Sequence, residues 1–132
     1  DKILLDAPCS GTGTIQKSPD TLEIYNPGMI KKLSYQQKRL ILKAYSLLKE
    51  NGILVYSTCS LEPEEDEEVI NHLLERTDAK LEKASLADLK SSPAILEFEG
   101  EKYNSEIKKC LRIWPQDNNT EGFFIAKIKK KA

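Results

Sequence analysis

Two cysteines stand in stretches of small and polar residues, each just after a strand-like apolar segment. Cys9 lies in DAPCSGTG (residues 6–13), and Cys59 lies in YSTCSLEPEE (residues 56–65). A deprotonated cysteine is a nucleophile that can form a covalent intermediate with a substrate. Most free cysteines are instead small buried apolar residues, although a core residue is not expected among Ser, Thr, Gly and Pro. The residues alone leave both interpretations open.

An acidic residue, Asp6, stands beside the first of these cysteines, directly after the apolar run Ile3-Leu4-Leu5. Its carboxylate could cap the turn that follows the strand. It could equally be a buried acid whose raised pKa lets it donate a proton to a substrate. Both possibilities remain open at this point.

The glycines of Gly11-Thr12-Gly13 resemble part of a phosphate-binding loop. The dinucleotide fingerprint is incomplete, because Gln16 stands where its third small residue belongs, and the Gly-Lys-Ser/Thr of a P-loop is missing. We therefore expect these glycines to permit a tight turn and the close approach of a planar or phosphate-bearing ligand.

Metal binding is not expected. The cysteines form no Cys-x-x-Cys pair, and the only histidine, His72, is far from them in sequence. The acidic run over residues 62–68 is interpreted as the solvated start of a helix. Three unpaired cysteines favour a reducing setting, so we expect a cytoplasmic protein.

The elements that must position these residues follow from the apolar pattern. Residues 2–7 and 53–56 are predicted to be buried strands of a parallel sheet. Between them, Ser34 and Gln37 match a capping box, which predicts that a helix begins there. A second helix is predicted to begin at Pro63. The carboxyl ends of neighbouring parallel strands meet at one edge of a sheet, so the two cysteines should meet there.

The C-terminal third contains two strand-like segments, residues 111–114 and 123–128, separated by a polar loop. We expect an antiparallel pair closing the edge of the sheet. Residues 77–109 carry no clear pattern. The fold class is therefore α/β, with parallel strands, crossover helices and an antiparallel edge pair.

The composition is that of an ordinary soluble domain. Among 132 residues, 39% are hydrophobic, and 20 Lys and Arg balance 21 Asp and Glu to a net charge of −1. This excludes a disordered charged tail, and no apolar run is long enough to span a membrane. Any contact with nucleic acid must be a local patch. The lysines at 127 and 129–131 are one candidate for phosphate contacts, although basic chain ends are common.

Taken together, residues 6–13 and 56–65 resemble the two cysteine motifs of the Sun-type (RsmB/Nop-like) RNA 5-methylcytosine methyltransferases. The segments GFFIAK (122–127) and LRIWP (111–115) resemble the family's last two strands. The sequence of the last third of the chain is most similar to that of the archaeal members of this family that act on tRNA. The resemblance implies a partial Rossmann-like methyltransferase fold and an RNA cytosine-C5 methyltransferase acting on structured RNA, either tRNA or rRNA.

The resemblance also implies roles for individual residues, with S-adenosylmethionine as methyl donor and no metal. Cys59 would add to carbon 6 of cytosine, Cys9 would assist product release, and Asp6 would contact the cytosine edge. The other expected contacts are with the cofactor at Asp6 and Pro8 and with the substrate at Ser10, Gly11, Thr58 and Ser60.

The family's cofactor loop is not found in this sequence, so residues 1–132 are expected to be the C-terminal half of a catalytic domain, from its fourth strand onward. The isolated chain would then be inactive, and the apolar edge at Ile3-Leu4-Leu5 would favour self-association. Two alternatives remain. A non-catalytic RNA-binding relative would be expected to lack one cysteine, and a thiol-redox protein would favour a close Cys-x-x-Cys pair.

Overall fold

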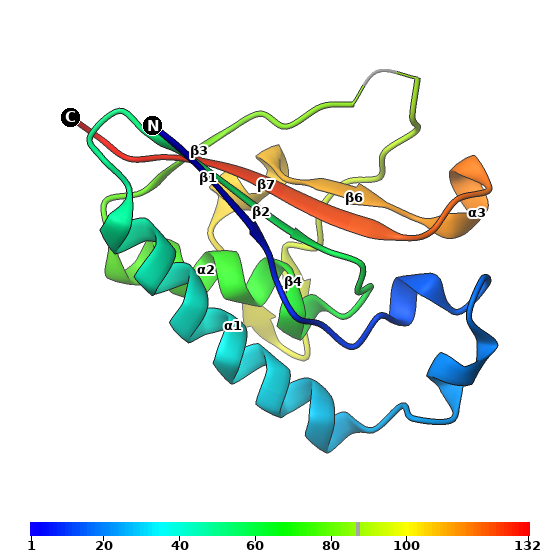
Figure 1. The fold of residues 1–132 in the computed structure, drawn as a ribbon. Helices are drawn as coiled ribbons and strands as arrows, with labels where there is room; N and C mark the ends of the chain where they lie inside the picture. Colours follow the sequence, from blue (N-terminus) through cyan, green and yellow to red (C-terminus); the bar gives the residue numbers. More distant parts are fainter. Residues whose placement is uncertain (87) are drawn as a thin grey trace.

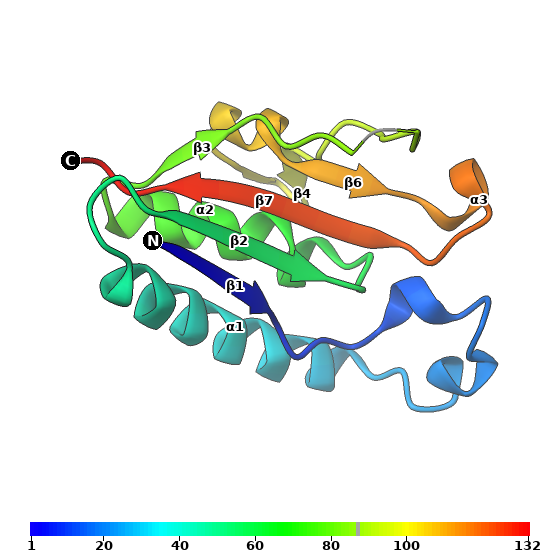
Figure 2. The same cartoon turned by 45° about the horizontal axis from the view of Figure 1, so that its top comes forward.

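The structure, a computed structural model, describes residues 1–86 and 88–132. It is an α/β fold in which two helices, α1 and α2, lie against one face of a twisted sheet (Figures 1 and 2). The α/β class predicted from the sequence is confirmed. In the described part of the chain, no helix has both the length and the apolar character needed to cross a membrane.

The sheet is built around its last strand. Strand β1 (Lys2–Asp6) pairs in parallel with β2 (Ile53–Thr58), and β2 pairs antiparallel with β7 (Phe123–Lys129). On its other side, β7 pairs antiparallel with both β3 (Lys80–Glu82) and β6 (Leu111–Ile113). The predicted antiparallel pairing of the last two strands is confirmed. Its second strand lies inside the sheet, and β3 and β6 share the outer position (Figure 2).

The core lies between the sheet and the helices. Every second residue of β7 faces the helices, which buries Phe124, Ala126 and Ile128 completely. Ile41 from α1 (Pro27–Leu47) and Ile70 from α2 (Glu67–Arg76) are buried against them. This packing holds both helices under the strands that carry the cysteine motifs.

Helix α1 begins at Pro27, seven residues before Ser34, so the predicted capping box is wrong. Asn26 is the N-cap, and its side chain accepts hydrogen bonds from the backbone N–H groups of Gly28 and Met29. Pro27 occupies the first helical position, which suits its restricted φ angle. Ser34 and Gln37 are buried inside the helix, where Ser34 donates to the Glu64 carbonyl and Gln37 donates to the Pro8 carbonyl.

The remaining elements are short. The predicted helix at Pro63 starts as a 3₁₀ turn (Pro63–Glu65) and continues as α2 after Asp66. The others are the 3₁₀ turns Thr12–Thr14, Pro19–Leu22 and Ser105–Lys109, the two-stranded ribbon of β4 (Glu97–Phe98) and β5 (Glu101–Lys102), and the short helix α3 (Pro115–Asn118).

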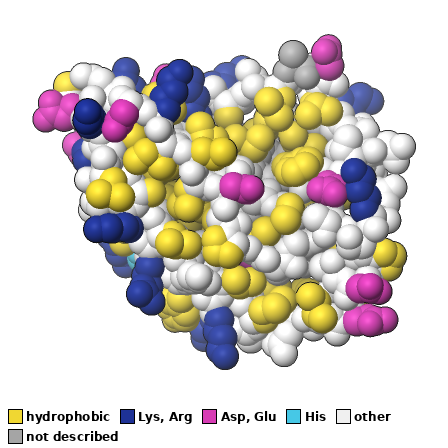
Figure 3. Space-filling model, in the orientation of Figure 1, with side chains coloured by type: hydrophobic (Ala, Val, Ile, Leu, Met, Phe, Trp, Pro, Cys, Tyr) yellow, Lys and Arg dark blue, Asp and Glu magenta, His cyan; other side chains and the backbone are white. Residues whose placement is uncertain are grey.

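Strand β1 has one neighbour among the described strands, and its outer side chains are open. Leu4 is 69% exposed. Figure 3 shows hydrophobic side chains gathered across the middle of the face seen in Figure 1, with most Lys and Arg side chains towards its margins. Such an edge offers unpaired backbone groups to another strand.

Candidate active site

The two cysteine loops leave the sheet side by side at the carboxyl ends of β1 and β2. The Sγ atoms of Cys9 and Cys59 are 3.1 Å apart, and both residues are free, half-buried cysteines. The parallel pairing of Asp6 with Ser57 brings the sulfurs together, because Cys9 follows the end of β1 by three residues and Cys59 follows the end of β2 by one. The predicted meeting of the two sulfurs is therefore confirmed.

Their contact makes the two thiols unequal. A hydrogen bond donated by the Cys9 S–H group lowers the pKa of Cys59 to about 7, against the opposing effect of burial. The same hydrogen bond and burial raise the pKa of Cys9 far above its ordinary value. At neutral pH, Cys59 is thus the thiol with substantial thiolate character, and the thiolate is the nucleophilic form.

Asp6 is exposed at the same edge, so the alternative of a buried acid is wrong. Its Oδ1 accepts a hydrogen bond from Ser57 Oγ at 3.1 Å. Its negative charge also opposes ionisation of Cys59. The exposure follows from the position of Asp6 on the open strand β1, where it can meet a polar ligand. Pro8 is exposed nearby, and its carbonyl accepts from Gln37 Nε2 at 2.7 Å.

The acidic run is not a solvated helix start, and that prediction is wrong: Glu65, Asp66 and Glu67 are fully buried. Glu65 lies between the two cysteine loops. Its Oε2 accepts from Ser10 Oγ and Ser60 Oγ, each at 2.6 Å. Its Oε1 accepts from the Ser10 backbone N–H at 2.8 Å and from Gln37 Nε2 at 3.1 Å. Four donors compensate the carboxylate for its loss of water.

The other two buried acids bind Arg112 of β6, which is also fully buried. Its guanidinium donates to Glu67 Oε1 at 2.7 Å and to Asp66 Oδ2 at 3.2 Å. Thr58 Oγ1 donates to the other oxygen of Asp66 at 2.6 Å. Burial raises the pKa of Asp66, and the Arg112 charge opposes that shift. The network joins the end of β2 to α2 and β6.

Gly13 approaches the backbone of two other segments, and close approach of a ligand to these glycines stays a prediction. A Cβ atom on Gly13 would lie 2.5 Å from the carbonyl oxygen of Cys59 and 2.6 Å from that of Gly122. The N–H of Gly13 donates to that Cys59 oxygen at 2.8 Å, and its carbonyl accepts from the Gly122 N–H at 2.8 Å. Gly11 supplies the turn, at a φ of 74°.

The residues predicted to bind substrate lie around the thiols but differ in exposure. The hydroxyls of Ser10, Thr58 and Ser60 are buried and point at carboxylates, so they support the loops. Gly11 is half-buried beside them. Direct contact of these residues with a substrate stays a prediction.

Three further residues lie outside the contact between Cys9 and Cys59. Lys130 Nζ donates to the carbonyls of Tyr45 and Leu48, so it caps the C-terminal end of α1. His72 is half-buried on α2, and its pKa is lowered by burial. Cys110 is buried, which raises the pKa of its thiol.

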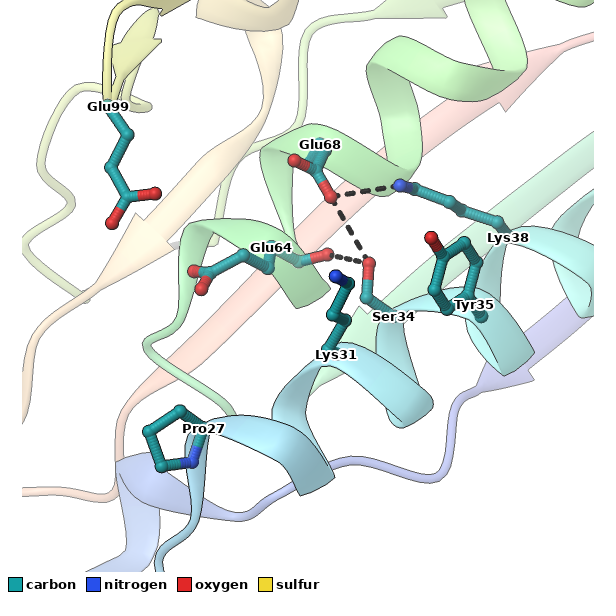
Figure 4. A pocket seen from close by; sticks show the side chains of 8 residues that line it. All are labelled: Pro27, Lys31, Ser34, Tyr35, Lys38, Glu64, Glu68 and Glu99. Carbon is teal, nitrogen blue, oxygen red and sulfur yellow. Dashed lines mark hydrogen bonds and ion pairs between the residues drawn. The ribbon is translucent and has the colours of Figure 1, made fainter.

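A separate cavity of about 480 Å³ lies between α1, the start of α2 and the β4–β5 ribbon. Figure 4 shows Lys38 meeting Glu68, with Ser34 donating to the Glu64 carbonyl below them. Charges of both signs line it, and neither cysteine does. Within residues 1–86 and 88–132, no three His, Cys, Asp or Glu residues are grouped so as to hold a metal ion.

Glu65, Gln37 and Arg112 are the residues of this site that sequence reasoning missed. One signal pointed to Glu65: the dipeptide Cys-Ser occurs twice, at 9–10 and 59–60, and both serines bind this one carboxylate. No comparable pattern marks Gln37 or Arg112, because their partners are 28 or more positions away.

The chain is similar in sequence to known RNA methyltransferases. Residues 1–129 match the sequence model of the family described as 16S rRNA methyltransferase RsmB/F. A tRNA (cytosine(49)-C(5))-methyltransferase of Pyrococcus abyssi is 53% identical over 130 residues, covering 98% of this chain and 42% of that protein. A ribosomal RNA small subunit methyltransferase F of Shewanella piezotolerans is 42% identical over 130 residues, covering 98% of this chain and 26% of that protein. The chain thus spans less than half the length of these relatives.

Solved structures from Pyrococcus horikoshii have the same fold. One, described as a methyltransferase homolog protein, superposes with a TM-score of 0.81 at 45% identity and covers 98% of this chain and 39% of that chain. Another is NSun6 with SFG, with a TM-score of 0.78 at 35% identity, covering 98% of this chain and 30% of that chain.

Proposed function

The chain belongs to the RsmB/F family of RNA methyltransferases, and from this we propose that its full-length protein methylates carbon 5 of a cytosine in RNA. The observation that carries the proposal is the 3.1 Å contact between Cys9 and Cys59. A cytosine presented to this pair would meet one thiolate and one thiol. The proposal also assigns residues 1–132 to the C-terminal half of a catalytic domain.

The proposed chemistry divides the work between the two sulfurs. The Cys59 thiolate adds to carbon 6 of cytosine, and the electron density gained by the ring makes carbon 5 nucleophilic. After carbon 5 carries the new methyl group, the proton on carbon 5 passes to water, and Cys9 assists this elimination. The bond between carbon 6 and Cys59 then breaks, which restores the ring and frees the thiolate.

S-adenosylmethionine would supply the methyl group. The end of β1 suits such a polar ligand, because Asp6 is exposed and, among the described residues, accepts a hydrogen bond only from Ser57. Asp6 and Pro8 are the proposed contacts on this chain, and Asp6 would also hydrogen-bond or protonate the cytosine edge. The relative NSun6 was solved with SFG, an S-adenosylmethionine analogue, which supports this donor.

The RNA must present its base unstacked, because a base within a helix cannot enter a pocket. We propose tRNA as the substrate, supported by the tRNA (cytosine(49)-C(5))-methyltransferase at 53% identity. Small-subunit rRNA is the alternative, supported by the description of the family and by the relative at 42% identity.

The test gives the full-length protein a tRNA that contains 5-fluorocytosine, together with S-adenosylmethionine. Fluorine at carbon 5 blocks proton removal, so a covalent complex is expected on a denaturing gel. Cys59→Ala should abolish the complex, whereas Cys9→Ala should accumulate a complex on ordinary tRNA. If Cys59→Ala still methylates RNA, Cys59 is not the nucleophile. A complex formed on rRNA transcripts alone would favour the alternative substrate.

A further inference from the structure

One buried carboxylate joins the two loops that carry the thiols. Ser10 follows Cys9 and Ser60 follows Cys59, and both serines donate to Oε2 of Glu65 at 2.6 Å. Consecutive Cα atoms are about 3.8 Å apart, so each contact lies one residue from a sulfur-bearing residue. Moving either serine must therefore move the adjacent cysteine.

Glu65 also has contacts other than those with Ser10 and Ser60. It lies in the 3₁₀ turn before α2, and its backbone carbonyl accepts from Tyr56 Oη at 2.7 Å. Gln37 of α1 donates to its Oε1 at 3.1 Å. Helix, strand and turn thus define the position of the carboxylate, and the loops adapt to it.

We propose that Glu65 is the positioning residue of the thiol pair, whose carboxylate holds the Cys9 and Cys59 loops at the separation that keeps the two sulfurs in contact. The carboxylate has no described contact with either sulfur. It reaches the cysteines through Ser10 and Ser60, and through Gln37, which also binds the Pro8 carbonyl, so it is not a catalytic residue. The proposal rests on the proposed function for its biological meaning, and on the geometry alone for its structural content.

We call Glu65 with its hydrogen bonds to Ser10 and Ser60 the clamp. Two other hydrogen bonds cross between the loops, so variants of the clamp should still fold. The N–H of Gly13 donates to the Cys59 carbonyl at 2.8 Å, and the N–H of Leu61 donates to Thr12 Oγ1 at 2.9 Å. Without Glu65 these bonds keep the loops paired. What changes is the relative placement of Cys9 and Cys59, which is the property to be measured.

The experiment measures the pH dependence of Cys59 alkylation by iodoacetamide in the full-length protein, with each cysteine resolved by peptide mass spectrometry. Ser60→Ala and Ser10→Ala each remove a hydroxyl contact to Glu65. Both should shift the midpoint of Cys59 alkylation upward by about one pH unit, because the Cys9 hydrogen bond that stabilises the thiolate is weakened. The double variant should shift it further.

Ser34→Ala is the matched control. Ser34 is equally a buried serine, with hydrogen bonds to the Glu64 carbonyl and to Glu68, but it bonds to neither Ser10 nor Ser60 nor the Glu65 carboxylate. Its midpoint should equal that of the unmodified protein. An equal shift in Ser34→Ala and Ser60→Ala would overturn the proposal, because the effect would then be general loosening.

Glu65→Ala and Glu65→Gln complete the series. Glutamine keeps a carbonyl for the Ser10 N–H, and its amide can donate to hydroxyls that rotate to accept. The midpoint of Cys59 alkylation in Glu65→Gln should lie between the midpoints of the unmodified protein and of Glu65→Ala. Folded Glu65→Gln and Ser60→Ala proteins that both retain the original midpoint would refute the clamp.

A second readout separates this proposal from the proposed function. In an RNA methylation assay, the Ser10, Ser60 and Glu65 variants should lower kcat about tenfold or more. KM for RNA should change little, as expected for misplacement of reacting groups. Alkylation requires neither RNA nor methyl donor. If no RNA is methylated but the midpoints shift as described, the function fails and the clamp stands. If kcat falls without any shift in midpoint, the clamp fails.

Discussion

At the residue scale, the contact between the sulfurs of Cys9 and Cys59 makes the ionisation of one thiol depend on the other. The hydrogen bond from Cys9 lowers the pKa of Cys59 to about 7. The thiolate of Cys59 is therefore half populated near pH 7 and is lost as the pH falls below that value. Cys9 keeps its proton throughout this range.

Replacing Cys9 by alanine removes the donor, so the pKa of Cys59 should rise towards its ordinary value of 9.0. The midpoint of Cys59 alkylation should then move from about pH 7 into the alkaline range. Stopped-flow alkylation followed by peptide mapping measures this. Cys110 is an internal control, since its buried, high-pKa thiol should not react at neutral pH in either protein. An unchanged midpoint in Cys9→Ala would show that another group stabilises the thiolate.

Gly13 is the second residue on which the geometry of the thiols depends. Gly13→Ala places a Cβ against two backbone carbonyls, and backbone cannot move aside as a side chain does. We expect a loss of about 1–3 kcal/mol in the free energy of unfolding, measured by urea denaturation.

Gly28→Ala is the control for this substitution. Its Cβ would meet only the side-chain oxygen of Asn26, at 3.0 Å, and alanine is favoured in a helix. The stability of Gly28→Ala should change by less than about 1 kcal/mol. If Gly13→Ala is equally mild, the loops can separate more easily than the backbone contacts indicate.

At the scale of elements, Arg112 joins β6 to α2. A buried ion pair of this kind adds little net stability when intact, but removing one partner leaves a buried charge uncompensated. Arg112→Met should therefore lower the free energy of unfolding by about 3–5 kcal/mol, because Asp66 and Glu67 lose their cation. Thermal and urea unfolding measure the loss.

Lys38→Met is the comparison for the ion pair. Lys38 pairs with Glu68 at 2.9 Å, but both side chains are partly exposed to water. Its removal should cost less than about 1 kcal/mol. Equal costs for the two variants would mean that Arg112 is not the main link between β6 and α2.

The limits of sequence reasoning are clear at this scale. The convergence of Cys9 and Cys59 was predictable, because neighbouring parallel strands carry their carboxyl ends to one edge. The burial of residues 65–67 was not, because the compensating donors come from Ser10, Gln37 and Arg112, which are distant in the chain. Ser34 and Gln37 have the spacing of a capping box, but their side chains bind the acidic turn at Glu64 and Glu65, which is distant in sequence.

At the scale of the whole molecule, we propose that the open edge of β1 favours self-association. The isolated 132-residue chain should form concentration-dependent oligomers through this edge. Leu4→Lys should reduce them, because Leu4 is 69% exposed and a charge there disfavours strand addition. Analytical ultracentrifugation measures the change. Leu47→Lys, on a similarly exposed leucine at the end of α1, is the control and should leave the oligomers unchanged.

The interior position of β7 has a consequence for synthesis. Strands β3 and β6 pair with β7 and with no other named strand among those described, yet both precede it in the chain. As the polypeptide emerges from the ribosome, β1, α1 and β2 can already assemble, whereas β3 and β6 must wait for a partner that has not been translated. The nascent chain therefore leaves β2 half covered until the last strand arrives and closes the sheet from within.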